Sequence, residues 1–403
     1  MTNYYSGQLL RNFQVDFLKE TLEPYFETKT EFNKEWCNNP AIGGWAKAAN
    51  IINNDLLFNN KTRVMIENTL YNELFYNAPD EIYVYPVTLI NQDVDNALQK
   101  LKNMALPIDR SFNTPVQNPS TFQLFSVKIE KNKINLLYRC GYTTDDEDKK
   151  TVFFIPCEID LTNKIILIKV KDNLKKRSEY KLREILELVF TNIKQLEFIN
   201  ISTMNPDLIR EIFYSMFSDE ASRAEEIIKE TIGLENIERK EQLTIDFLKD
   251  SLDIIESPVF STQINKVMSI YFHQQAKTLL DHEFGNRYLY AFSFYDGLQT
   301  KSSTRNTDKS HVYTGNLYWT LKDLIHEKKR IAEISMFYKF NHLNFSSEIA
   351  GYDFKHVEIN YKESNHGILL DFPNYNKKRR DPERSVKCEY IIWELRKHLS
   401  KYI

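Results

Sequence analysis

The sequence predicts an α+β protein in which helical stretches and a small antiparallel sheet follow one another along the 403-residue chain. Apolar residues recur every three to four positions in some stretches, whereas short runs elsewhere are rich in aromatic and β-branched residues. The chain is long enough for two or three domains with their own cores, and its 42% of apolar residues indicates a globular protein. We expect a helical N-terminal region, a small antiparallel β-meander, a helical middle and a basic α+β C-terminal domain.

Residues 1–78 are expected to form the helical N-terminal region. In residues 8–26, leucines and phenylalanines recur at intervals of three to five, which is the spacing of one helix face. Residues 36–52 and 62–76 are further helix candidates, and Pro79 marks the end of the region.

Residues 79–175 are expected to form the β-sheet domain. Aromatic and β-branched residues dominate its strand candidates, which are residues 81–87, 122–129, 133–142, 151–159 and 164–171. A helix is expected at residues 92–101. The polar segments 143–150 and 160–163 have the composition of turns, so the last four strands should form an antiparallel meander.

Residues 176–257 are expected to be helical, and residues 258–403 to mix both types of element. The expected helices of the middle region are residues 179–198, 206–217, 221–232 and 241–255. For the last region we expect helices at 263–280, 317–330 and 386–402, a strand at 287–295, and a hairpin formed by 354–360 and 368–372.

The charge of the chain reverses near Ser257. Residues 258–403 hold 22 Lys and Arg against 16 Asp and Glu, a balance of +6, and the remaining 31 and 40 give residues 1–257 a balance of −9. All eight histidines also lie in the C-terminal part. Because the residue before a proline avoids the α region, Ser257 and Pro258 make a plausible domain boundary. The basic part favours a polyanion as partner, and the acidic helical part favours a protein partner or self-association.

The sequence disfavours several classes of protein. It contains neither the G-x-x-x-x-G-K-[ST] motif of a P-loop NTPase motor nor a G-x-G-x-x-G motif. Residues 1–13 have no apolar core of a signal peptide, and no apolar run approaches 18 residues. The four cysteines are scattered without a C-x-x-C pair. We therefore expect a soluble cytoplasmic protein with no cofactor and no membrane association.

The segment from Arg305 to His311 contains the sharpest local pattern, R-N-T-D-K-S-H. It resembles the R-x4–6-H signature of HEPN ribonucleases, which often place a polar residue directly after the arginine. The resemblance covers these seven residues. It implies metal-independent RNA cleavage, in which His311 helps to activate the ribose 2′-OH and Arg305 stabilises the charged phosphorane. The alternative is an exposed polar loop.

A basic cluster near the C-terminus is the candidate nucleic-acid-binding site. Four adjacent cations cannot be buried together and can neutralise several phosphates, and a neighbouring tyrosine could stack on an unpaired base. The candidate residues are Tyr375, Lys377, Lys378, Arg379, Arg380, Arg384 and Lys387. The alternative is a solvated loop whose charge is partly balanced by Asp381 and Glu383.

The expected C-terminal hairpin contains two histidines and two carboxylates. His356 and Glu358 share one face of a strand, and His356 would face Asp371 across a four-residue turn that contains His366. Two histidines with a carboxylate can bind a metal. Because the register is not fixed by the sequence, we assign no metal site.

The favoured interpretation is a cytoplasmic nucleic-acid-associated protein without its own NTPase motor, from a bacterial antiviral defence or mobile-element system. One alternative is a metal-independent ribonuclease that uses Arg305 and His311. A second alternative is a non-enzymatic assembly subunit, in which the charges are solvated and the aromatic residues form the core.

Overall fold

The computed structural model describes residues 5–56, 60–90, 94–130, 132–251, 258–295, 301–306, 308–341, 354–373 and 383–402. The chain divides into two compact units. Unit 1 comprises Met1–Met204 and Ser364–Glu389, and unit 2 comprises Asn205–Glu363 and Tyr390–Ile403. Helices and antiparallel strands occur in both units, so the predicted α+β class is confirmed.

Short helices form the N-terminal part of unit 1. They are α1 (Gly7–Leu10), α2 (Val15–Leu22), α3 (Lys29–Asn38), α4 (Gly44–Ile51) and α5 (Asn60–Asn72), with π-helical turns η2 (Ile52–Leu56) and η3 (Glu73–Asn77). Gly43 has φ +90°, which separates α3 from α4 where one helix was expected. The Cα of Gly44 lies so close to the side chain of Val15 that an added Cβ would stand 2.6 Å from it, so α2 and α4 pack tightly.

The sheet of unit 1 is antiparallel, with strand order β2-β3-β4-β5-β1-β11, and β6 pairs with the far part of β1. The strands are β1 (Glu81–Leu89), β2 (Phe122–Ile129), β3 (Lys133–Thr144), β4 (Lys150–Asp160), β5 (Ile165–Val170), β6 (Ile199–Ile201) and β11 (Gly367–Asp371). The consecutive order β2 to β5 is the predicted meander. Asp160 closes its last turn by accepting hydrogen bonds from the backbone and side-chain nitrogens of Asn163.

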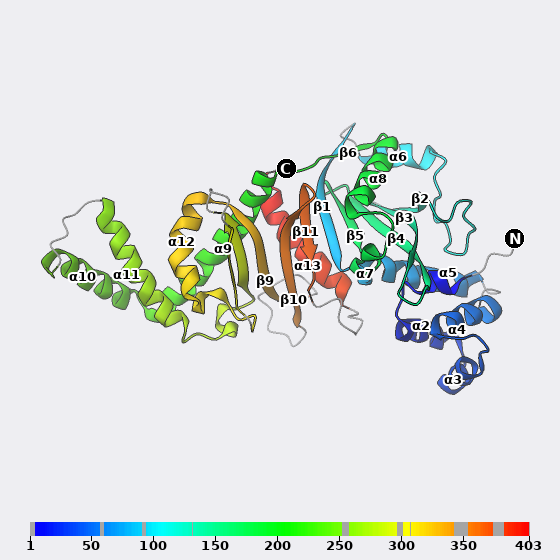
Figure 1. Ribbon diagram of the computed structural model, residues 1–403, viewed down its shortest axis with the longest axis horizontal. Coiled ribbons are helices and arrows are strands. Elements are labelled where there is room, and N and C mark those ends of the chain that lie inside the picture. Colours follow the sequence, from blue (N-terminus) through cyan, green and yellow to red (C-terminus); the bar gives the residue numbers. More distant parts are fainter. Residues whose placement is uncertain are drawn as a thin grey trace. The chain divides into compact units, whose positions relative to one another are not determined.

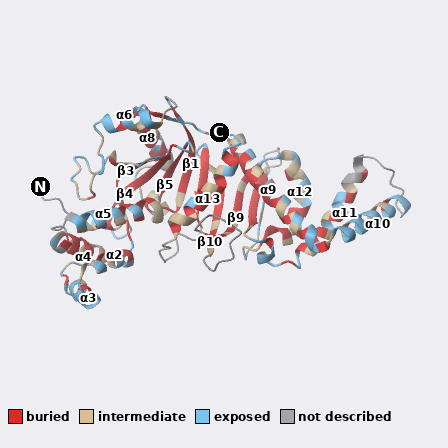
Figure 2. Ribbon diagram, turned by 180° about the vertical axis from the view of Figure 1, so that it is seen from behind, coloured by how far each residue is buried: buried red, intermediate tan, exposed pale blue. Residues whose placement is uncertain are grey.

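Helices cover both faces of this sheet (Figure 1). Along β4, Phe153 and Ile155 pack into a core shared with α8 (Leu182–Gln195), whereas Val152 and Phe154 pack into a core shared with α1 to α5. The remaining helices of unit 1 are α6 (Val94–Asn103) and α7 (Asp172–Lys176). Because both faces are covered, β4 and β5 are buried almost throughout, as the colouring of Figure 2 shows.

Unit 2 is built on one long helix, α9 (Pro206–Ile232). The side chain of Asn205 accepts a hydrogen bond from the backbone N–H of Asp207, which caps the helix, and Gly233 ends it with φ +84°. Two helices were expected here. The sheet of unit 2 is antiparallel in the order β10-β9-β7-β8, and α9 packs against β9 and β7.

The other elements of unit 2 follow α9 along the chain. The helices are α10 (Leu234–Asp246), η4 (Phe247–Ser251), α11 (Pro258–Ala276), η5 (Asp281–Phe284), η6 (Val312–Thr314) and α12 (Asn316–Lys328). The strands are β7 (Arg287–Tyr295), β8 (Lys301–Arg305), β9 (Ile331–Asn341) and β10 (Phe354–Ser364). The last helix, α13 (Arg384–Leu399), begins in unit 1 and continues into unit 2.

The two units do not coincide with the four consecutive regions expected from the sequence. The chain passes from unit 1 to unit 2 after Met204, and unit 1 also includes the C-terminal segment Ser364–Glu389. The expected boundary at Ser257 lies outside the described residues. Proteolytic cleavage at that boundary stays a prediction. In the described part of the chain, the helices are all too short or too polar to cross a bilayer.

Candidate functional site

The R-x5-H segment forms a loop that is tied together by its asparagine. Arg305 ends the edge strand β8, and His311 stands directly before η6. The side-chain amide of Asn306 donates to the backbone oxygen of His311 at 2.6 Å, and it also contacts Ser310 and the hydroxyl of Thr314. The polar residues of this segment therefore define its conformation.

The imidazole of His311 lies in an aromatic core, with 1% of the residue exposed. Its ring centroid is 4.2 Å from that of Phe284, 5.6 Å from that of Tyr313 and 6.4 Å from that of Tyr288. Nε2 stands 3.3 Å from the backbone oxygen of Leu279, so Nε2 carries the proton and donates it. Burial lowers the pKa of this ring, which favours the neutral form.

The two motif residues occupy different environments. Arg305 is exposed, whereas His311 is buried and does not belong to an exposed polar loop. Among the described residues, no hydrogen bond or ion pair joins the two side chains. The roles that the resemblance implies require an imidazole that RNA can reach, and the described arrangement does not offer one.

The basic cluster is described only in part. Tyr375, Lys377, Lys378, Arg379 and Arg380 lie outside the described residues. The two remaining members belong to the start of α13. Arg384 is 7% exposed and donates from Nη1 to the backbone oxygen of Asn77, while Nζ of Lys387 lies 3.6 Å from a carboxylate oxygen of Glu383. Arg384 therefore makes a contact within unit 1, and its role in binding nucleic acid stays a prediction.

The hairpin residues do not form a metal centre in the described part of the chain. Asn365 and His366 both have positive φ, so β10 and β11 flank a two-residue turn, and counting outwards from that turn does not put His356 opposite Asp371. The carboxylate of Glu358 pairs with Lys309. No group of three His, Cys, Asp or Glu side chains among the described residues could hold a metal ion.

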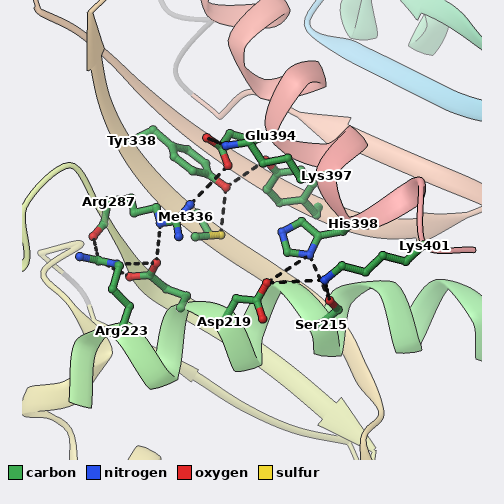
Figure 3. Close-up of polar contacts among 12 residues, drawn as sticks. Ser215, Asp219, Arg223, Arg287, Met336, Tyr338, Glu394, Lys397, His398 and Lys401 are labelled. Atoms are coloured by element: carbon green, nitrogen blue, oxygen red, sulfur yellow. Dashed lines mark hydrogen bonds and ion pairs between the residues drawn. The ribbon is translucent and has the colours of Figure 1, made fainter. Parts of the chain in front are cut away.

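A buried ionic network in unit 2 was not predicted from the sequence (Figure 3). Arg287 on β7 joins two carboxylates: its Nε is 2.9 Å from Glu220 on α9, and its Nη1 is 3.4 Å from Glu394 on α13. Arg223 pairs with Glu220 from one helical turn away, and Lys397 is 2.8 Å from Glu394.

Each carboxylate of this network has cationic partners, which identifies it as a structural connection between α9, β7 and α13. Glu220 is 1% exposed, so burial raises its pKa while Arg223 and Arg287 lower it. A sequence signal existed: Glu220 and Arg223 are three residues apart, beside Phe217, Ala221 and Ala224 on the apolar face of α9.

The edge strand β8 carries two exposed cations. Its burial alternates along the strand, and Lys301, Ser303 and Arg305 are the exposed positions. Lys301 is paired with Glu333 at 2.8 Å, whereas Arg305 makes no ion pair with a described residue. Arg305 is therefore available to an external anion.

Comparisons with known proteins found no match to this chain among family models, curated proteins or solved structures.

Proposed function

We propose that the protein associates with nucleic acid through the basic C-terminal part of its chain, as a cytoplasmic protein of a bacterial defence or mobile-element system. The observation that carries this proposal is the charge reversal, from −9 in residues 1–257 to +6 in residues 258–403. A phosphate backbone binds clustered cations and releases counterions, which favours association without sequence preference.

The surface of β8 supports the proposal. Arg305 is exposed, makes no ion pair with a described residue, and shares its strand face with Ser303 and Lys301. A guanidinium in this state retains all its donors for a phosphate. The run Lys377 to Arg380 contributes four further cations on sequence grounds.

The test is a binding titration with single-stranded RNA and with double-stranded DNA at several salt concentrations. Alanine replacement of Lys377, Lys378, Arg379 and Arg380 is expected to weaken binding and to flatten the dependence of log K on log salt by about one unit per lost phosphate contact. Arg305→Ala is expected to lower the slope by about one unit.

A matched control removes four cations from the acidic part of the chain. Lys29, Lys149, Lys176 and Arg183 have side chains that are exposed in unit 1, and their replacement by alanine changes the net charge equally. The proposal requires that this control variant binds like the wild type. Equal affinities and slopes for the wild type and the C-terminal variant would refute it.

A second candidate function, an assembly subunit, is favoured by apolar side chains exposed on α10 and η4. Leu243 and Phe247 are each 56% exposed and lie four residues apart, on one face of a helical segment. Large apolar side chains grouped on a surface are typical of protein interfaces. These residues belong to the helical middle that was expected to recruit a partner or a second copy.

Light scattering after size exclusion tests self-association through this face. The double variant Leu243→Glu/Phe247→Glu is expected to have a smaller mass than the wild type, because two buried charges oppose an apolar contact. Ile42→Glu is the control, since Ile42 is exposed on unit 1. A monomeric wild type would exclude self-association.

A further inference from the structure

Unit 1 contains a cavity of about 590 Å³. It lies between residues of β3 and β4, the α1 segment, and the loop of residues 104–121 that joins α6 to β2. Its volume is within the range of sites that hold small organic ligands, roughly 300–1,000 Å³. A loop of this length without secondary structure of its own is commonly a binding loop.

The loop that covers the cavity is anchored to the helices of unit 1. The backbone N–H of Phe112 donates to a carboxylate oxygen of Glu67 on α5 at 3.2 Å, and the hydroxyl of Ser111 donates to the same carboxylate. Phe112 in turn packs against Phe125 and Phe154, with ring centroids 6.1 and 5.9 Å away. The cavity therefore has a preformed aromatic wall.

Arg139 on β3 reaches this cavity although it is only 8% exposed. Its Nε donates to the backbone oxygen of Pro119 at 3.1 Å, and its guanidinium carbon lies 5.0 Å from the ring centroid of Tyr142. Its terminal nitrogens Nη1 and Nη2 make no hydrogen bond or ion pair with any described residue, and neither is fully buried.

A β-bulge directs Arg139 and Tyr142 into the same space. Residues three apart on a regular strand point to opposite faces, but the register of β3 against β4 shifts between these two positions. Gly141 lies in the bulge with φ +76°, and a Cβ there would stand 2.7 Å from the backbone oxygen of Ser120 in the covering loop. Gly141 thus permits both the bulge and the approach of the loop.

The charge of Arg139 lacks a counterpart. None of the described residues that line the cavity is an aspartate or a glutamate. A guanidinium that is nine-tenths buried normally has an anionic partner, because its desolvation is otherwise uncompensated. The two free terminal nitrogens have the geometry for a bidentate contact with a carboxylate or a phosphate.

We propose that this cavity is a binding site for a small aromatic anion. The carboxylate or phosphate of the ligand accepts hydrogen bonds from Nη1 and Nη2 of Arg139, and its ring packs against Phe112, Phe125 and Phe154. This site lies in unit 1 and is independent of the proposed association with nucleic acid through the C-terminal part.

Calorimetric titration of the full chain tests the proposal with four probes. 2-Naphthoate supplies ring and carboxylate, 2-naphthamide supplies the same ring without charge, adenosine monophosphate supplies ring and phosphate, and sulfate supplies an anion alone. We expect 2-naphthoate or the nucleotide to saturate one site, at least about tenfold more tightly than 2-naphthamide and sulfate. The comparison between 2-naphthoate and the nucleotide identifies the anionic group.

Variants assign the binding to Arg139. Arg139→Met is expected to weaken binding of the anionic probe by at least about tenfold, and Arg139→Lys less, because lysine keeps the charge but not the planar fork. Arg183→Met is the control, since Arg183 is an exposed arginine of unit 1 outside the cavity. Circular dichroism checks that each variant is folded.

Three results would overturn the proposal, and two of them use the wild type alone. These are equal affinity for 2-naphthoate and 2-naphthamide, full affinity in folded Arg139→Met, and no saturation by either anionic probe up to about 5 mM.

Discussion

At the scale of single residues, the imidazole of His311 acts as a packing side chain. Three aromatic rings surround it, and its Nε2 proton is donated to the backbone of Leu279. The motif in the sequence identified a residue with suitable chemistry. It did not show that the ring is buried together with the following residues, Val312 and Tyr313.

Replacement of His311 by alanine is therefore expected to destabilise the protein by about 2–4 kcal/mol, because it leaves a cavity between aromatic rings. Arg305→Ala is expected to change stability by no more than about 0.5 kcal/mol, since Arg305 is exposed. Urea unfolding measures both. The ribonuclease alternative would instead be supported if the wild type cleaved RNA in EDTA and both variants lost this activity without losing stability.

Asp80 is a second residue whose environment determines its behaviour. Its carboxylate is buried and accepts a hydrogen bond from the backbone N–H of Asp172 at 2.7 Å. Burial raises the pKa of Asp80 to about 6, while the hydrogen bond and Arg384 oppose this change. The folded state thus prefers the protonated carboxyl, and this contribution is full below the ordinary pKa of 3.8 and lost as the pH rises through about 6.

Asp80→Asn keeps an acceptor for Asp172 and removes the charge. We expect it to raise the free energy of unfolding by about 1–3 kcal/mol near pH 8, where wild-type Asp80 is ionised, and to change it little near pH 4. Urea unfolding at both pH values provides the measurement. An equal effect at the two pH values would mean that ionisation of Asp80 is not the cause.

At the scale of elements, the ionic network connects three segments that are distant in sequence. Arg287 on β7 contacts Glu220 on α9 and Glu394 on α13, and both carboxylates are buried. Removing the cation leaves buried negative charge with fewer partners. The network is therefore one of the contacts that attach α13 within unit 2, beside the packing of Tyr390 on Phe340.

Arg287→Met is expected to destabilise unit 2 by about 3–5 kcal/mol, measured as a loss in the free energy of unfolding. The double variant Glu220→Gln/Arg287→Met should lose less than the sum of the two single variants, because it removes both charges of one pair. Arg183→Met is a matched control: its pair with Glu187 is exposed, and we expect an effect of no more than about 0.5 kcal/mol. Additive losses would argue against coupling.

Sequence periodicity predicted the elements whose partners are local. The meander β2 to β5 and its Asp160 turn follow from runs of aromatic and β-branched residues and from turn chemistry. Three features depend on distant partners and were missed. The first is helix α9, which continues through Glu220, where Arg287 compensates the buried charge. The second is β8, which has no apolar residue and forms by pairing with β7. The third is β9, which lies between β7 and β10.

The candidate site was predictable to a lesser extent. The sequence proposed Arg305 as a catalytic residue, and the structure places it on the exposed face of β8. The sequence also proposed Arg384 as a nucleic-acid-binding residue, and its contact with the backbone of Asn77 could not be predicted because the two residues are distant in sequence. The cavity at Arg139 was not found, because a bulge and a loop remote from β3 in sequence create it.

At the scale of the whole molecule, unit 1 combines residues 1–204 with a segment from near the C-terminus. Strand β11 pairs with β1 along four residues, from Glu81 opposite Asp371 to Val84 opposite Ile368. A division that follows the chain from one end to the other cannot show such a unit. Charge and histidine content still distinguish the two parts of the sequence, but they do not mark the boundary of a compact unit.

Limited proteolysis is expected to cut near residue 258 and to give a basic fragment that extends towards the C-terminus. This fragment contains β11, so it should remain bound to the N-terminal fragment through β1 and separate only in denaturant. Native size exclusion of the digested protein, followed by denaturing electrophoresis of the same fractions, tests this. Separate elution of the two fragments without denaturant would contradict it.

The pairing of β11 with β1 also sets the order of events during synthesis. Residues 81–84 leave the ribosome early, but their partners at 368–371 are made only when most of the chain has been translated. Until then, this part of β1 is an unprotected sheet edge, of the kind that promotes aggregation. A nascent chain that stalls before Gly367 would therefore keep that edge open to pairing with other chains.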